Sequence, residues 1–209
     1  MYILGLTGSI GMGKTWGTKC FRHLGVAVHD ADACVHRLLA PGGAATAEVA
    51  NVFPGVLSTQ NGVDRQKLGA YVFSDDSALD TLQAVLHPLV HQDQRLFLAQ
   101  CQRRRVALAV LDIPLLYETK ARMRVDAVVV MSAPAFVQRQ RVLRRATMTE
   151  AKLNTILARQ VPDEIKRQVA EYVVTTGATR GQALRQIAKI VKVTKTMKGQ
   201  AWSPDWPLT

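Results

Sequence analysis

The sequence predicts an α/β fold in which helices cover a doubly wound parallel sheet. A glycine-rich motif, Gly8-Ser9-Ile10-Gly11-Met12-Gly13-Lys14-Thr15, directly follows a strand-like N-terminal segment. Two largely apolar runs, at 106–111 and 126–131, have the composition of strands that are buried on both faces of a parallel sheet. Helix-like stretches separate these segments, which is the alternation typical of parallel sheets.

Before residue 60 the expected elements are short, and glycine or proline ends the helices. Alternating, branched residues predict the first strand. The expected elements are a strand over 2–7, a helix over 14–24 ended by Gly25, a strand over 26–28, a helix over 33–40 ended by Pro41 and a helix over 44–53. Residues 54–63 contain glycine, proline and asparagine and predict a loop.

After residue 60 helices dominate, and the block at about 60–105 is expected to be a helical insertion between strands. The expected helices are 65–73, 76–85, 88–104, 134–146, 149–159 and 180–192, with a last strand at 172–175. These elements predict one domain over 1–192. The remaining stretch, 193–209, has no periodicity and is expected to be a flexible tail.

The composition limits the classes of protein to consider. Apolar residues make up 48% and charged residues 21%, as in globular chains. No apolar run reaches the roughly 18–20 residues of a bilayer span, and the N-terminus lacks the features of a signal peptide. Cys20, Cys34 and Cys101 are widely spaced, which indicates reduced thiols. We therefore expect a cytoplasmic protein without a membrane partner, as a monomer or small homo-oligomer.

The chain is strongly basic, with a formal net charge of +11. A basic surface attracts polyanions, which include nucleic acid, acidic membranes and phosphorylated small molecules. It is equally consistent with a basic face that contacts only solvent. The charge alone does not choose among these partners, so the positions of the arginines matter more than their number.

The motif over residues 8–15 matches G-x-x-x-x-G-K-[ST] and predicts binding of a nucleoside triphosphate. Its glycines let backbone N–H groups surround phosphate oxygens, and the following helix adds its positive N-terminus. Lys14 is expected to reach the β- and γ-phosphates, and Thr15 to place its hydroxyl on Mg²⁺. The expected nucleotide-binding residues are Gly8, Gly11, Met12, Gly13, Lys14, Thr15 and Trp16. Switches, motors and helicases share this loop, so it does not by itself indicate a kinase.

A candidate catalytic carboxylate follows the second expected strand. Asp30 and Asp32 lie two residues apart and so share one face of an extended segment. Ligands of doubly wound sheets bind at the carboxyl ends of strands, where Asp32 is placed to orient an acceptor hydroxyl and take its proton. The alternative is that Asp32 caps the helix over 33–40.

A second acidic position, Asp112, ends the apolar run at 106–111. An acid in this position resembles the Walker-B carboxylate that holds Mg²⁺ or water. The alternative is a simple turn residue. Glu118 lies six residues later in the same loop.

Arg141 and Arg145 lie four residues apart, on one face of an expected helix. Mobile arginines of this kind close over phosphates and stabilise the transferred phosphoryl group. A solvated face and a nucleic-acid patch are the alternatives, although no aromatic residues are interleaved with these arginines. His87 and His91 are also four residues apart, but no third ligand accompanies them, so no metal site is expected there.

Taken together, these segments resemble the dephospho-CoA kinase family over about residues 2–192. The resemblance is carried by segments in a specific order and spacing: 4–15, Asp30-Ala31-Asp32, Asp64-Arg65, Val72-Phe73, Leu86-His87-Pro88-Leu89, 112–118, Gln138, Arg141, Arg145, Gln160 and Ala170-Glu171-Tyr172-Val173-Val174.

The resemblance implies a nucleotide-binding core, a helical CoA-binding insertion and a helical lid at about 138–166. It implies transfer of the γ-phosphoryl of ATP to the 3′-hydroxyl of dephospho-CoA, the last step of coenzyme A biosynthesis, with Mg²⁺ as cofactor. Asp32 matches the proposed base, and Arg141 and Arg145 match the lid arginines. The other implied substrate-side residues are Arg65, His87, Asp112 and Glu118, with Asp112 near Mg²⁺.

Three positions depart from the family pattern. Trp16 stands where a small residue or threonine is usual, and Glu171 and Thr176 replace the more usual Asp and Asn. Trp16 is expected to alter packing under the nucleotide, and Glu171 and Thr176 to alter the contacts to the nucleotide base.

Two alternatives differ in class from the main prediction. Another small-molecule kinase would share the phosphate-binding loop but would not need the segments around His87 and 112–118. A nucleotide switch or nucleic-acid-binding module would use the positive charge. However, the sequence has no Asn-Lys-x-Asp motif for reading guanine, and binding of nucleic acid is not expected.

Overall fold

A computed structural model describes residues 1–203 and 206, except for the side chains of Phe73 and Ser74. The chain forms two compact units. The sheet unit comprises Met1–Asp30 and Leu98–Trp206, and the helical unit comprises Ala31–Phe97. The helical unit therefore begins about thirty residues before the expected insertion at 60–105.

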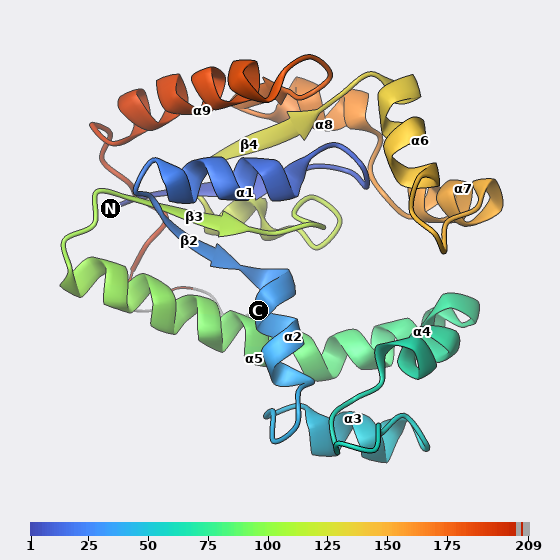
Figure 1. The fold of residues 1–209 in the computed structure, drawn as a ribbon. Helices are drawn as coiled ribbons and strands as arrows, with labels where there is room; N and C mark the ends of the chain where they lie inside the picture. Colours follow the sequence, from blue (N-terminus) through green and yellow to red (C-terminus); the bar gives the residue numbers. More distant parts are fainter. Residues whose placement is uncertain (204–205, 207–209) are drawn as a thin grey trace. The chain divides into compact units, whose positions relative to one another are not determined.

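Within the described residues, five strands of the sheet unit form one parallel sheet in the order β2-β3-β1-β4-β5 (Figure 1). They are β1 (Tyr2–Thr7), β2 (Ala27–Asp30), β3 (Leu108–Asp112), β4 (Ala127–Ser132) and β5 (Tyr172–Thr175). The apolar runs became β3 and β4, which are buried along their whole length. The predicted α/β parallel fold is confirmed.

The register brings the carboxyl ends of three strands together. Leu6 of β1 pairs with Asp112 of β3, and Asp112 also pairs with Asp30 of β2. The phosphate loop, which we define as Gly8–Thr15, begins one residue beyond β1. The loop and two carboxylates thus lie at the same edge of the sheet, where ligands of such folds bind.

Helices α1 (Lys14–His23) and α9 (Arg180–Thr194) pack against each other on one face of the sheet (Figure 1). Their apolar side chains form one core cluster with alternate residues of the strands, including Leu4, Phe21, Val129 and Ile187. The sheet unit also contains the 3₁₀ helix η1 (Ala121–Arg124), α6 (Ala135–Leu143), α7 (Glu150–Ala158) and α8 (Asp163–Val169). Helix α8 was not expected from the sequence.

The helical unit is built from α2 (Ala31–Leu38), α3 (Thr46–Val52), α4 (Arg65–Ser74) and the first part of α5 (Asp76–Arg103). It has a core of its own, which includes Leu39, Val49, Phe53, Leu68 and Leu82. Asp64 caps α4 by accepting hydrogen bonds from the backbone N–H groups of Gln66 and Lys67. In the expected loop, Leu57 and Val63 form an isolated antiparallel bridge.

Helix α5 corrects the prediction of two helices, at 76–85 and 88–104. It runs through Pro88 without ending. Proline removes one helical hydrogen bond, but Leu82, Leu86 and Val90 are buried on both sides of it. Burial of this apolar stripe outweighs the local preference for a break.

The C-terminal segment also differs from the expected flexible tail. Helix α9 extends to Thr194, and Asp126 Oδ1 accepts hydrogen bonds from the backbone N–H groups of Gln200 and Ala201, at 2.6 and 2.8 Å. Trp206 is only 1% exposed and donates from Nε1 to the Arg124 carbonyl. Two tryptophans supply the apolar surface that fixes this segment, and residues 204, 205 and 207–209 of the expected tail lie outside the described residues.

Candidate active site

The phosphate loop has the backbone conformation that its glycines permit. Gly11 and Gly13 have φ values of +77° and +90°, in the left-handed region that side chains with a Cβ rarely occupy. Gly13 is the N-cap of α1, so the N-terminus of that helix opens directly on the loop. Such an arrangement directs backbone N–H groups and the positive end of the helix toward a bound anion.

Lys14, Asp112 and Thr18 form the polar centre beside the loop. Lys14 Nζ lies 2.7 Å from Asp112 Oδ1, and the Thr18 hydroxyl donates to Asp112 Oδ2 at 2.5 Å. Asp112 is 2% exposed. Burial raises the pKa of this carboxyl, although Lys14 and Thr18 act in the opposite direction. Thr18 was not among the expected site residues, but its position four residues after Lys14 places it on the same helical face.

Arg141, on α6, contacts the backbone of the phosphate loop. Its guanidinium donates to Thr176 Oγ1 at 2.9 Å, to the Thr176 carbonyl at 2.5 Å and to the Gly11 carbonyl at 3.4 Å. Thr176 in turn donates its hydroxyl to the Met12 carbonyl at 2.8 Å. The side chain of Arg145, which follows α6, is exposed and has no hydrogen-bond or ion-pair partner in the described part of the chain.

Glu118 belongs to a buried ion pair. Its Oε1 lies 2.8 Å from Lys166 Nζ and accepts from the Val161 N–H at 2.9 Å. Lys166, on α8, has no exposed surface, and its Nζ also lies 3.4 Å from Ser9 Oγ in the phosphate loop. No sequence signal pointed to Lys166, because its partners are distant along the chain.

The positions that depart from the family pattern have separate environments. Trp16 packs on the core of the sheet unit, and the Arg180 guanidinium lies 5.2 Å from its ring centroid. Glu171 precedes β5, at the amino ends of the strands and so at the opposite end of the sheet from the phosphate loop. Its Oε1 accepts from the Arg122 guanidinium at 2.6 Å, and its Oε2 accepts from the Val128 N–H at 2.7 Å. Glu171 therefore braces the sheet, whereas Thr176 contacts the loop.

The helical unit holds the other expected site residues. Asp32 is exposed in the first turn of α2, which begins at Ala31, so Asp32 is not the cap of a helix over 33–40. Arg65 begins α4, and its Nη1 lies 3.0 Å from His36 Nδ1. The rings of His87 and His91 stack on α5 with centroids 5.8 Å apart.

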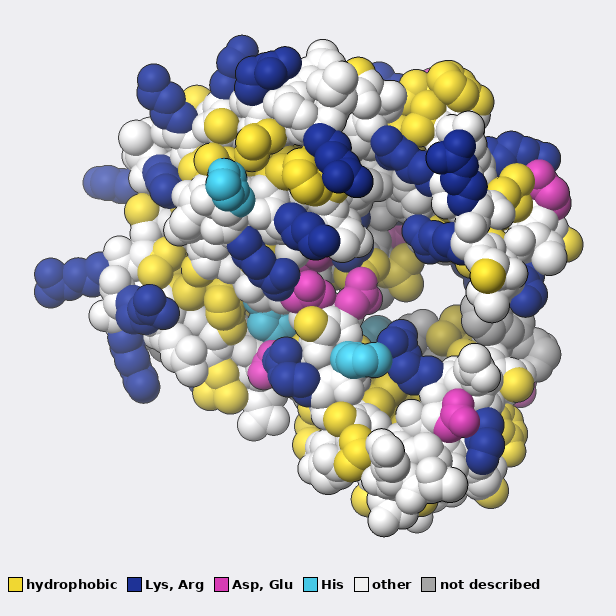
Figure 2. Space-filling view, viewed as in Figure 1, with side chains coloured by type: hydrophobic (Ala, Val, Ile, Leu, Met, Phe, Trp, Pro, Cys, Tyr) yellow, Lys and Arg dark blue, Asp and Glu magenta, His cyan; other side chains and the backbone are white. Residues whose placement is uncertain are grey.

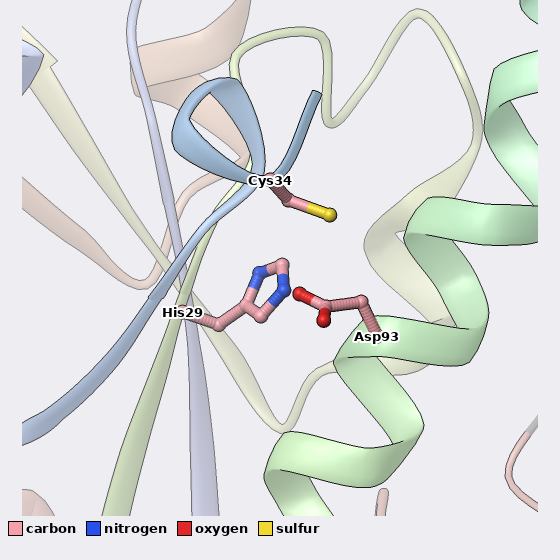
Figure 3. Close-up of side chains that lie close together, drawn as sticks. All are labelled: His29, Cys34 and Asp93. Atoms are coloured by element: carbon pink, nitrogen blue, oxygen red, sulfur yellow. The ribbon is translucent and has the colours of Figure 1, made fainter. Parts of the chain in front are cut away.

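Cys34 of α2 and Asp93 of α5 interact within the helical unit (Figure 3). Burial, together with a hydrogen bond to Asp93, raises the pKa of the Cys34 thiol to about 12. This thiol therefore stays protonated at neutral pH and is a poor nucleophile. All three cysteines are free and buried, which agrees with the expectation of reduced thiols.

The structure brings Asp112 and Arg141 to the phosphate loop, which contains Lys14 and Thr15, and all four residues belong to the sheet unit. Lysine and arginine side chains are spread over much of the visible surface (Figure 2). In the part of the chain that the structure describes, no helix combines the length and apolar character needed to cross a bilayer.

Comparisons with known proteins identify the family of the chain. The dephospho-CoA kinase family model matches residues 2–180. A dephospho-CoA kinase from Mesorhizobium japonicum is 50% identical over 199 residues, which cover 95% of this chain and all of the relative. One from Rhodospirillum rubrum is 54% identical over 185 residues, which cover 88% of each chain.

Solved structures show the same fold. TT1252 from Thermus thermophilus is 31% identical, with a TM-score of 0.77 over 92% of this chain and 96% of that chain. Dephospho-CoA kinase from Campylobacter jejuni is 20% identical, with a TM-score of 0.61 over 92% of this chain and 96% of that chain. The family model and the close relatives span most of the sequence, so the chain belongs to the dephospho-CoA kinase family.

Proposed function

We propose that this chain transfers the γ-phosphoryl group of ATP to the ribose 3′-hydroxyl of dephospho-CoA, giving coenzyme A and ADP. The phosphoryl-transfer part of the proposal rests on the Lys14–Asp112 pair, at 2.7 Å, beside a phosphate loop with left-handed glycines, and the acceptor rests on membership of the dephospho-CoA kinase family. Catalysis of phosphoryl transfer consists mainly of positioning and charge stabilisation. A loop, a lysine and a buried carboxylate at one sheet edge supply both.

Each residue has a defined task in this proposal. Lys14 neutralises phosphate oxygens, and the loop N–H groups hold them. Asp32 accepts the proton of the attacking hydroxyl. Arg145, which is exposed, stabilises charge on the transferred group, while Arg141 holds the loop through Gly11 and Thr176.

Arg65 and His87 are assigned to the acceptor, whose phosphates attract cationic and hydrogen-bonding side chains. Glu118 has one oxygen engaged by Lys166 and Val161, and this leaves Oε2 for a further donor. We therefore assign Glu118 first to supporting the loop and second to the acceptor.

The residues at the loop also fit Mg²⁺. Thr15, at the start of α1, offers a hydroxyl, and Asp112 offers a carboxylate. Hydroxyl and carboxylate oxygens are the ligands that Mg²⁺ prefers. When bound, the ion would neutralise charge on the β- and γ-phosphates.

The proposal is tested by measuring ADP and coenzyme A formation from ATP and dephospho-CoA. We expect stoichiometric formation of both products, and no ADP formation above background with AMP, uridine or adenosine as acceptor. Lys14→Met, prepared in the same way, controls for contaminating kinases. Phosphorylation of a nucleoside or AMP without turnover of dephospho-CoA would overturn the proposal. So would salt-sensitive nucleic-acid binding without any turnover.

A further inference from the structure

Two glutamine side chains hold the backbone of a single residue in the phosphate loop. Gln138 Nε2 donates to the Ile10 carbonyl at 2.8 Å, and the Ile10 N–H donates to Gln160 Oε1 at 3.1 Å. Gln138 lies on α6 and is 7% exposed, while Gln160 follows α7 and is half-buried. Both polar backbone groups of Ile10 are therefore satisfied by side chains more than a hundred residues away.

We propose that Gln138 and Gln160 form a clamp that positions the phosphate loop for ATP. They are positioning residues, because they act on ATP through the backbone of the loop and not by direct contact. The inference rests on the proposed use of this loop for ATP.

The conformation of the loop explains why it needs such a clamp. A loop that turns its N–H groups toward phosphates leaves other backbone groups pointing into the protein, where each needs a partner. Ile10 lies between β1 and α1, so its backbone groups take no part in the hydrogen bonds of the sheet or of the helix. The glutamine amides supply one donor and one acceptor to it, and they do so without a net charge beside the phosphates.

Helix α6 also packs closely against the loop. A Cβ placed on Gly11 would lie 2.6 Å from Val142 Cγ2 and 3.1 Å from the Gln138 carbonyl. The clamp residues and this contact all fall within the segment 138–166, which was expected to be a lid. Gln138 and Gln160 thus tie two points of that segment to the loop, and Arg141, which lies between them, also contacts the loop backbone.

The test compares Gln138→Met, Gln160→Met and the double variant with Gln140→Met, a matched control that is exposed on the same helix. ATP affinity is measured by calorimetry without the acceptor, and KM is measured for both substrates. Each single substitution at the clamp should weaken ATP binding about three- to tenfold, because each removes one hydrogen bond. The KM for dephospho-CoA should change less than about twofold. The double variant should lose less than the product of the single effects, since both side chains hold Ile10.

Hydrogen exchange gives a direct readout. The Ile10 amide should exchange slowly in the wild type and Gln140→Met proteins and faster in Gln160→Met. If Gln138→Met does not fold, the half-buried Gln160→Met carries the test alone. Unchanged ATP affinity, or equal increases in the KM of both substrates, would overturn the clamp. If the wild-type protein does not turn over dephospho-CoA, that result counts only against the proposed function, because ATP binding is measured separately.

Discussion

Lys166 Nζ lies 2.8 Å from Glu118 Oε1, and the whole lysine side chain is inaccessible to solvent. An ammonium group in such a position is tolerated only because a carboxylate compensates its charge. The pair joins α8 to the loop after β3, and its lysine also reaches Ser9 in the phosphate loop. Loss of the Lys166–Glu118 pair should therefore mainly lower the free energy of unfolding.

Lys166→Met should lower the free energy of unfolding by about 3–5 kcal/mol, because the Glu118 carboxylate, which is 14% exposed, then loses the cation that compensates its charge. The measurement is urea unfolding followed by circular dichroism. Lys166→Met combined with Glu118→Gln should recover most of the loss. The control Lys189→Met, on the exposed surface of α9, should change stability by no more than about 0.5 kcal/mol. Equal losses in Lys166→Met and the control would contradict the assignment.

Asp112 should make stability depend on pH. Burial raises the pKa of this carboxyl, so the folded protein binds the proton more tightly than the unfolded chain does. Its contribution to stability is therefore largest below the ordinary carboxyl pKa and is lost as the pH rises through the raised value. Asp112→Asn should remove that slope. At neutral pH the variant should be as stable as the wild type or more stable, while turnover falls about 100-fold.

The Asp112 prediction is checked by urea unfolding at several pH values and by initial rates at saturating ATP. A variant that loses stability at neutral pH and keeps its turnover would show that Asp112 serves the fold and not the reaction.

Asp32→Asn should reduce turnover by about two orders of magnitude or more while ATP affinity survives, because only the proton acceptor is removed. Glu48→Gln is a matched control, since Glu48 is an exposed carboxylate in the first turn of α3 in the same unit. Rates are measured by coupled ADP detection, and ATP binding by calorimetry. Near wild-type turnover in Asp32→Asn would assign Asp32 to the helix terminus alone.

Arg141 and Arg145 should respond differently to replacement by alanine. Arg141→Ala loses the hydrogen bonds to Thr176 and Gly11, so it should lower both ATP affinity and stability, the latter by about 1–3 kcal/mol. Arg145→Ala should leave stability unchanged and lower turnover about 100-fold. Thermal unfolding and initial rates separate these effects, with the exposed neighbour Arg144→Ala as control. If Arg145→Ala matches Arg144→Ala in rate, Arg145 belongs to a solvated face.

Trp206→Ala should destabilise the protein by about 3–5 kcal/mol, because a buried indole and its hydrogen bond to Arg124 are lost together. Trp202 is only partly buried, and its Nε1 donates to Gln102, so Trp202→Ala should cost less. Urea unfolding followed by circular dichroism measures both. A Trp206→Ala variant as stable as the wild type would show that the C-terminal segment adds nothing to the fold.

Local patterns predicted most of the fold. The first and last strands have the expected bounds, 2–7 and 172–175, because alternation and apolar runs encode strand burial directly. The predicted break in α5 was wrong because tertiary burial around Pro88 overrides a local rule. Helix α8 was missed because it has only two apolar residues, Ile165 and Val169, and both are exposed, so it shows no buried apolar stripe.

Within the site, the phosphate loop and Asp112 were visible as contiguous patterns. Thr18 lies four residues after Lys14, so helical spacing is sufficient to place it beside that lysine. Lys166 and Thr176 have no such signal, because each meets the loop from more than 150 residues away. Contacts of that range depend on the packing of several helices, which a single sequence does not display.

One carboxylate fastens both termini of the sheet unit. Asp126 Oδ2 accepts from the Ile3 N–H at 2.7 Å, while Oδ1 accepts from residues 200 and 201. A Cβ on Gly199 would collide with the Met1 carbonyl, so the two stretches run in contact. An affinity tag fused ahead of Met1 would therefore begin in contact with the segment around Gly199. A circularly permuted enzyme, linked from a point beyond Trp206 to Met1 and opened in the exposed turn near Ala146, should retain the sheet because this anchor persists.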